Sequence, residues 1–189
     1  MREGGSMKLI SLLPADTYMV INKSIITEDD KRNIIALYEP IIGPIAVCLY
    51  FTLLRDIQVM DYISMKDYTH HHLMSVMKSG IEIIKLARES LEGVGLLKSY
   101  VKEGNSNSYV YELYSPLSPK EFFASPVFNI TLYNNLGKNE YELIKSSYEL
   151  PKVDIGDYED ISRTLDLTYK SSSSYTFFET KERNSLSVK

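Results

Sequence analysis

Residues 37–54 form the most apolar stretch of the chain, and they constrain the fold more than any other part. We interpret the stretch as the end of one helix, a corner and the start of a second helix. Pro40 disfavours helical backbone at Glu39, so the first helix is predicted to stop there. Gly43 permits a sharp bend, and Pro44 can occupy the first turn of a new helix because its missing N–H is not needed there.

The second helix of this stretch, expected from residue 45 to residue 54, is apolar at almost every position. A helix without a polar face is normally buried on most of its sides. It is too short to span a bilayer, which takes about 20 residues. We therefore place Leu49 in the core and interpret Cys48, the one cysteine of the chain, as a small buried hydrophobe.

Composition limits the classes of protein to which the chain can belong. Its 189 residues, 44% of them hydrophobic, suffice for one ordinary core with an appendage. The formal net charge of −4 gives no overall attraction to nucleic acid, so any contact with phosphates must come from a local patch. A single cysteine excludes an internal disulfide bond, and the N-terminus lacks the apolar core of a signal peptide. We therefore expect a cytoplasmic protein.

Changes in composition divide the chain into three parts. Residues 7–26 alternate short apolar runs with turn residues, and we expect a weakly ordered N-terminal arm over residues 1–26 that lies extended on the domain. Thr27 and the three acidic residues after it predict a helix start, because a hydroxyl caps free N–H groups and carboxylates favour the positive end of a helix dipole. The main domain is expected over residues 27–150. The acidic, serine-rich residues 151–189 are expected to form a linker or tail.

Two helices are predicted in the middle of the main domain. Thr69 is a candidate N-cap for a helix over residues 70–78. A second helix is predicted over residues 80–91, where apolar residues recur at helical spacing on one side and charged residues occupy the opposite arc. Glycines after residue 91 end this helix.

A β hairpin is predicted directly after these helices. From residue 97 the hydrophobic period changes to two, and residues 104–107 have the composition of a tight turn. Helices followed by a hairpin are the order of a winged helix. Two or three further helices are predicted beyond residue 116. The predicted fold class is therefore mainly α (α+β), a winged-helix domain with a two-stranded β hairpin plus additional C-terminal helices.

Four motifs, taken together and in this order, resemble a known family. They are Leu37-Tyr38-x-Pro40-x-Ile42-Gly43-Pro44-x-Ala46-x-x-Leu49-Tyr50, Leu91-Glu92-Gly93-x-Gly95-Leu96-Leu97, Tyr111-Glu112-Leu113-x-x-Pro116-Leu117-x-Pro119-x-x-Phe122-Phe123 and Leu132-Tyr133-x-x-Leu136-Gly137-x-x-x-Tyr141. They resemble the N-terminal domain of the replication initiation and membrane attachment proteins of Firmicutes. These proteins belong to the DnaB/DnaD family of primosomal helicase loaders, which is distinct from the enterobacterial replicative helicase of the same name. The resemblance covers about residues 10–145.

The resemblance implies a winged-helix module that self-associates and helps bring the replicative helicase to the origin, beside an initiator and an ATPase loader. Family members carry further helical domains, with a single-stranded DNA motif that ends in tryptophan. This sequence has no tryptophan, so that activity is not carried over. An alternative function is a winged-helix transcription regulator that reads duplex DNA. Association with the nucleoid and with the membrane periphery would follow from the resemblance, although no basic amphipathic helix supports direct membrane contact.

Tyr38 and Tyr50 are the candidate self-association residues, since the pattern alone leaves open whether they point into the core or into a second subunit. A homo-oligomer is expected, together with contacts to other replication initiation proteins and to the helicase or its loader.

Five basic residues are candidates for DNA contact. Those on or beside the helix over 80–91 share its polar arc with glutamates at spacings of three or four, so a solvated, ion-paired face is the favoured interpretation there. The two on the hairpin are slightly better candidates for phosphate contact, although simple solubility residues are the favoured interpretation there too. Tyrosines are expected in the core and at interfaces rather than as stacking platforms, and for Tyr100 beside these lysines the question is open. The five residues are Lys78, Lys85, Arg88, Lys98 and Lys102.

No catalytic or cofactor-binding motif is found in the sequence. It lacks a phosphate-binding Gly-x-x-x-x-Gly-Lys-Ser/Thr loop, so this chain is not the ATPase partner of helicase loading, and it lacks a Gly-x-Ser-x-Gly elbow. The run His70 to His72 suggests a metal site, but consecutive helical side chains diverge by about 100° and cannot converge on one ion. We predict a binding protein rather than an enzyme, without metal or cofactor.

Overall fold

The computed structural model describes residues 11–59, 68–149, 151, 154, 156–164 and 168. Contacts divide the chain into a first compact unit, residues 1–149, and a second unit, residues 150–189. The described residues of the second unit are all exposed.

The first helical segment begins where the sequence predicts. Thr27 caps α1 (Glu28–Asn33) through a reciprocal pair of hydrogen bonds. The Asp30 backbone N–H donates to the Thr27 hydroxyl oxygen at 3.1 Å, and the Thr27 backbone N–H donates to the Asp30 carboxylate at 2.8 Å. Both interactions use N–H groups that have no partner inside a helix, so they stabilise the start of α1.

The predicted stop of this helix at Glu39 is wrong. The chain continues through a wider π-helical turn (Ile34–Tyr38) into α2 (Glu39–Ile42), and Glu39 keeps helical backbone angles. Pro40 is tolerated because it lies in the first turn of α2, after the wide turn has interrupted the regular hydrogen-bond pattern. The corner itself lies at Gly43, whose φ of +80° is accessible to glycine at little cost.

Helix α3 (Pro44–Val59) is the central helix of the unit, as the apolar stretch predicts. Its buried side chains include Leu49, Tyr50 and Leu53. The prediction that Cys48 is buried is wrong, because this thiol is exposed. Cys48 lies one turn from the exposed Ile45, so α3 leaves a narrow line of its surface open to solvent.

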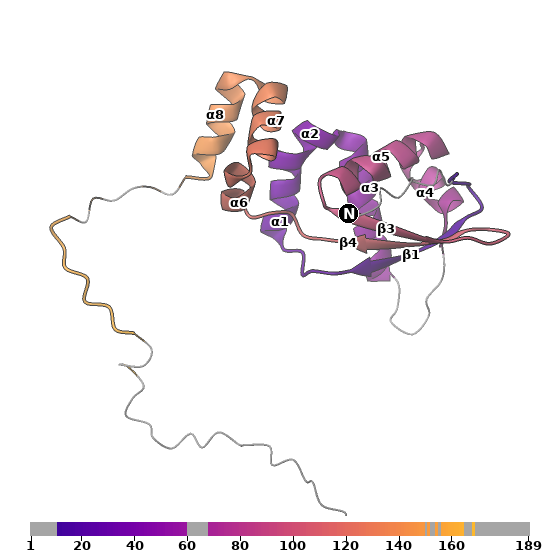
Figure 1. Cartoon of the computed structure of the whole chain (residues 1–189), viewed down its shortest axis with the longest axis horizontal. Coiled ribbons are helices and arrows are strands. Elements are labelled where there is room, and N and C mark those ends of the chain that lie inside the picture. Colours follow the sequence, from indigo (N-terminus) through magenta and orange to yellow (C-terminus); the bar gives the residue numbers. More distant parts are fainter. Residues whose placement is uncertain are drawn as a thin grey trace, which may run out of the picture. The chain divides into compact units, whose positions relative to one another are not determined.

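The winged-helix pattern is confirmed. Helices α4 (His70–Met77) and α5 (Ile81–Gly93) precede the hairpin of β3 (Leu97–Lys102) and β4 (Ser108–Leu113). Thr69 occupies the N-cap position of α4 but makes no side-chain capping bond. Figure 1 shows α4 and α5 on one side of the strands.

The sheet is larger than the predicted hairpin, with strand order β2-β1-β4-β3. The additional strands are β1 (Thr17–Asn22) and β2 (Tyr68–Thr69). Strand β1 pairs in parallel with β4 over its whole length. The expectation of a weakly ordered arm is therefore wrong for residues 17–22, because backbone hydrogen bonds to two neighbours hold them inside the sheet.

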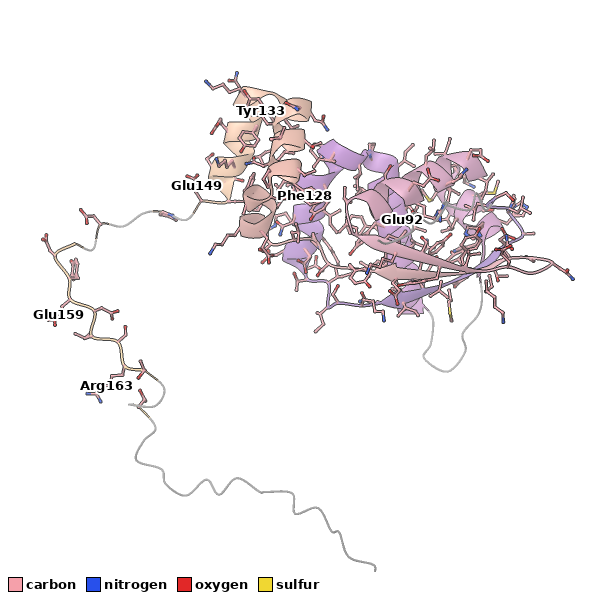
Figure 2. All side chains as sticks on the ribbon, in the orientation of Figure 1. Glu92, Phe128, Tyr133, Glu149, Glu159 and Arg163 are labelled. Carbon is pink, nitrogen blue, oxygen red and sulfur yellow. The ribbon has the colours of Figure 1, made fainter. Side chains whose placement is uncertain are left out.

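In the described part of the chain, three helices follow the hairpin, α6 (Pro119–Ala124), α7 (Pro126–Leu136) and α8 (Lys138–Ser147), in agreement with the predicted C-terminal extension. An aromatic cluster attaches them to the first helical segment. The Tyr38 ring centroid lies 5.2 Å from that of Phe122 and 5.6 Å from that of Phe128. Figure 2 labels Phe128 near the start of α7 and Tyr133 toward its end.

Candidate functional site

Helix α5 occupies the position of a recognition helix, but its main cation is not available to phosphates. Ile84, Ala87 and Leu91 are buried against the rest of the fold. The Arg88 side chain is only 16% exposed, and its Nη1 lies 3.2 Å from the Glu92 carboxylate, as the spacing predicts. A mostly buried, paired guanidinium presents little of its charge to solvent, so Arg88 is a packing residue of α5.

The remaining surface of α5 is apolar and acidic rather than basic, since Glu82 and Glu89 are also exposed. Leu86 is 62% exposed, and Ile83 beside it is also exposed. Lys85 is half-buried, and the ion pairs predicted for it with Glu82 and Glu89 do not form. Lys78 is exposed at the end of α4, where it adopts left-handed backbone with a φ of +53°. The structure therefore does not gather these lysines with Arg88 into one cationic surface.

The hairpin lysines lie at the surface. Lys98 and Lys102 alternate with Tyr100 on β3, and all three side chains are exposed. The Lys98 ammonium lies 5.2 Å from the centre of the Tyr114 ring, within range of a cation–π interaction.

Glu112 organises the side chains around these lysines. Its carboxylate accepts hydrogen bonds from the Tyr100 hydroxyl at 3.1 Å and the Tyr114 hydroxyl at 3.0 Å, and pairs with Lys23 at 3.1 Å. Desolvation alone would raise the pKa of Glu112, but hydrogen bonds from Lys23, Tyr114 and Tyr100 outweigh it and lower the pKa. Sequence reasoning missed Lys23 and Glu112 because they meet only when β1 pairs with β4.

Tyr38 and Tyr50, the candidate self-association residues, lie inside the fold, which answers the question of orientation that the sequence leaves open. Both rings are buried within one chain. The Tyr38 hydroxyl accepts a hydrogen bond from the Leu117 backbone N–H at 3.0 Å, and the Tyr50 hydroxyl donates to the Tyr114 carbonyl at 2.8 Å. Burial raises the pKa of both phenols. They join the hairpin and the connection to α6 to the helical core.

A second feature that the sequence did not allow us to predict is a buried polar network between the sheet and α4. The His70 Nδ1–H donates to the Asp16 carbonyl at 2.8 Å, so His70 Nε2 accepts from the Tyr111 hydroxyl at 2.7 Å. Burial lowers the pKa of His70. A little further along the sheet, the Tyr18 hydroxyl donates to Asp56 at 2.7 Å. The network serves packing, since every one of these side chains is buried.

The three consecutive histidines have three different environments. His70 is buried in the network, His71 is exposed, and the His72 ring stacks on Tyr68 with centroids 4.5 Å apart. Among the described residues, no three histidine, cysteine or carboxylate side chains are placed to hold one metal ion. None of the described helices is long and apolar enough to cross a membrane.

The chain is similar to known proteins in sequence and in structure. The chain is 24% identical, over 172 residues, to the replicative helicase loading/DNA remodeling protein DnaB of Staphylococcus aureus. The aligned region covers 90% of this chain and 37% of that protein. It also resembles the crystal structure of residues 1–300 of the primosome protein DnaB from Geobacillus stearothermophilus, with 30% sequence identity and a TM-score of 0.75. That similarity covers 82% of this chain and 59% of the other.

The chain thus spans well under half of the length of the curated relative. The family model of the DnaB N-terminal winged helix domain matches residues 12–188. This range includes the whole sheet, all the described helices and most of the second unit. The chain therefore belongs to the family of DnaB N-terminal winged helix domains.

Proposed function

We propose that this chain is the N-terminal oligomerisation and protein-binding module of a replication initiation accessory protein, which assists loading of the replicative helicase at the origin. The observation that carries this proposal is the family match over residues 12–188. The Staphylococcus aureus relative is a helicase loading protein, and this chain corresponds to 37% of it. Loading by the longer protein would then use this domain as a docking unit and not as a source of catalysis.

The surface of the first unit supports a role in protein binding. Exposed apolar side chains occur on α5 at Ile83 and Leu86, and on α7 at Val127, Ile130 and Tyr133. Apolar side chains that recur along one helix face are typical of surfaces that bind other proteins. The partners we propose are a second copy of the chain, other initiation proteins, and the helicase or its loader, in the cytoplasm at the nucleoid and at the membrane periphery.

Self-association is tested on the purified chain by light scattering at high micromolar concentration. We expect dimers or larger species. Because Tyr38 and Tyr50 are internal, substitutions of exposed residues on α5 and α7, such as Leu86→Asp and Ile130→Asp, should dissociate the oligomer while the chain keeps its folded circular dichroism spectrum. A chain that is monomeric at every concentration would contradict the oligomerisation part of the proposal.

Docking to replication proteins is tested by co-elution of the chain with the purified helicase and with the helicase–loader complex. We expect a stable complex with at least one of them, weakened by Leu86→Asp. The alternative function, a transcription regulator that reads duplex DNA, predicts instead a sequence-selective and salt-dependent mobility shift. The low exposure of Arg88 and the apolar and acidic surface of α5 favour protein docking over reading of the major groove.

A further inference from the structure

The sheet has one face covered by helices and one face open to solvent. Side chains on β1, β4 and β3 alternate between buried and accessible positions. We call the accessible side the outer sheet face, and its members are Thr17, Met19, Ile21, Lys98, Tyr100, Lys102, Ser108, Val110 and Glu112.

Strand register arranges the outer sheet face in rows. The central row crosses the three strands as Met19, Val110 and Tyr100. The rows on either side of it end in Lys98 and Lys102 on β3. Successive residues on one side of a strand are about 7 Å apart. The Tyr100 ring is 49% exposed. It therefore lies between two lysines and beside the apolar residues Met19 and Val110.

The charge on this face is opposite to that of the whole chain. Lys23 neutralises Glu112 through their 3.1 Å ion pair, although Glu112 stands directly opposite Lys98 in the strand register. Neither Lys98 nor Lys102 forms an ion pair with a described residue. Lys98 and Lys102 on the face, with Lys23 beside it, stand against one glutamate and leave a local excess of two positive charges on a chain whose net charge is −4.

We propose that the outer sheet face binds single-stranded nucleic acid, with one base stacked on Tyr100 and the adjoining phosphates held by Lys98 and Lys102. An exposed aromatic ring between cations on an open sheet matches the two requirements of single strands, a stacking surface and neutralised phosphates. A paired duplex keeps its bases stacked on each other and cannot use the ring. This binding is separate from docking to replication proteins and does not depend on it.

The test is fluorescence anisotropy of a labelled oligothymidine of about 20 nucleotides, titrated with the purified chain at low salt. Tyr100→Ala should weaken binding about tenfold or more, and Tyr100→Phe should stay within about twofold of the original chain because the ring remains. Lys98→Glu with Lys102→Glu should weaken binding and reduce the slope of log affinity against log salt by about 1.4, from two lost phosphate contacts.

The matched control is Lys120→Glu with Lys138→Glu, two exposed lysines on α6 and α8 that change the net charge equally. It should bind as the original chain does, apart from a small general electrostatic effect. An unchanged affinity of Tyr100→Ala, an equal loss in the control, or a preference for duplex would each overturn the proposal. So would failure to bind the oligonucleotide at low salt, which would assign the face to a protein partner. None of these outcomes affects the co-elution test of protein docking.

Discussion

At the scale of single residues, buried hydrogen bonds decide which side chains are structural. Tyr38 and Tyr50 each bond to a backbone group far away in the sequence, and Tyr18 bonds to Asp56 across the core. Removing one partner of such a pair leaves a buried polar group without compensation, at a cost of about 1–3 kcal/mol. These tyrosines therefore act as supports of the fold, which moves the search for binding residues to the exposed side chains.

The neighbouring residues Leu49 and Cys48 test the burial pattern of α3. Leu49 is fully buried and Cys48 is exposed. Leu49→Asp should cost several kcal/mol and prevent folding, because an unpaired carboxylate would enter the core. Cys48→Asp should fold with a melting temperature close to that of the original chain. Thermal unfolding followed by circular dichroism distinguishes them, and a native-like melt of Leu49→Asp would show that the assignment of this face is wrong.

His70 should make stability depend on pH. Burial lowers its pKa in the folded state, so below about pH 6.5 the unfolded chain takes up a proton that the folded chain resists. The free energy of unfolding is therefore retained above this pH and falls below it, by up to about 1.4 kcal/mol per pH unit for this group. Urea denaturation over roughly pH 8 to 5 measures the decline.

The matched pair for this experiment is His70→Gln and His71→Gln, since His71 is exposed. His70→Gln should be less stable at neutral pH but should lose less stability on acidification. His71→Gln should decline as the original chain does. Equal slopes in all three proteins would assign the acid sensitivity to another group.

At the scale of secondary-structure elements, the sequence patterns predicted those elements that interactions between residues close in the sequence determine. The helices α4 and α5 and the β3–β4 hairpin were predicted because each is specified by its own periodicity and turn residues. The position of β1 could not be predicted in this way, since its partner β4 lies far along the chain. For the same reason Lys98, Tyr100 and Lys102 were identified on the hairpin, whereas Lys23 and Glu112 were not. The prediction that the helix stops before Pro40 failed because it did not include the π-helical turn that precedes α2.

The corner between α2 and α3 depends on one glycine. Gly43 combines a φ of +80° with a ψ of +161°, a region used almost only by glycine. Gly43→Ala should destabilise the chain by about 1–3 kcal/mol, although an added methyl group would meet no atom. Gly93 at the end of α5 also has open space and no positive φ, so Gly93→Ala should be neutral or stabilising by about 0.4–1 kcal/mol. Equal urea midpoints of the two variants would contradict the backbone argument.

At the scale of the whole molecule, the two units differ in how their side chains are placed. The first unit buries one continuous core that includes Tyr141 on α8, and Tyr148 after α8 donates a hydrogen bond to Asn33 at 3.0 Å. The described residues of the second unit contribute nothing to that core. The family match nevertheless extends to residue 188. Two shortened chains can therefore distinguish the residues that folding requires from residues that only belong to the family match.

A chain ending at Glu149 retains the first unit and should keep the melting temperature of the full chain within a few degrees, because none of the described core side chains is removed. A chain ending at Leu136 loses α8, with the buried Tyr141 and the Tyr148–Asn33 bond. Burial of a large side chain contributes about 1.5–3 kcal/mol, so this second truncation should lower the melting temperature by several degrees. Differential scanning calorimetry measures both. A large loss of stability on removal of residues 150–189 alone would mean that the second unit stabilises the first, and would move the domain boundary beyond Glu149.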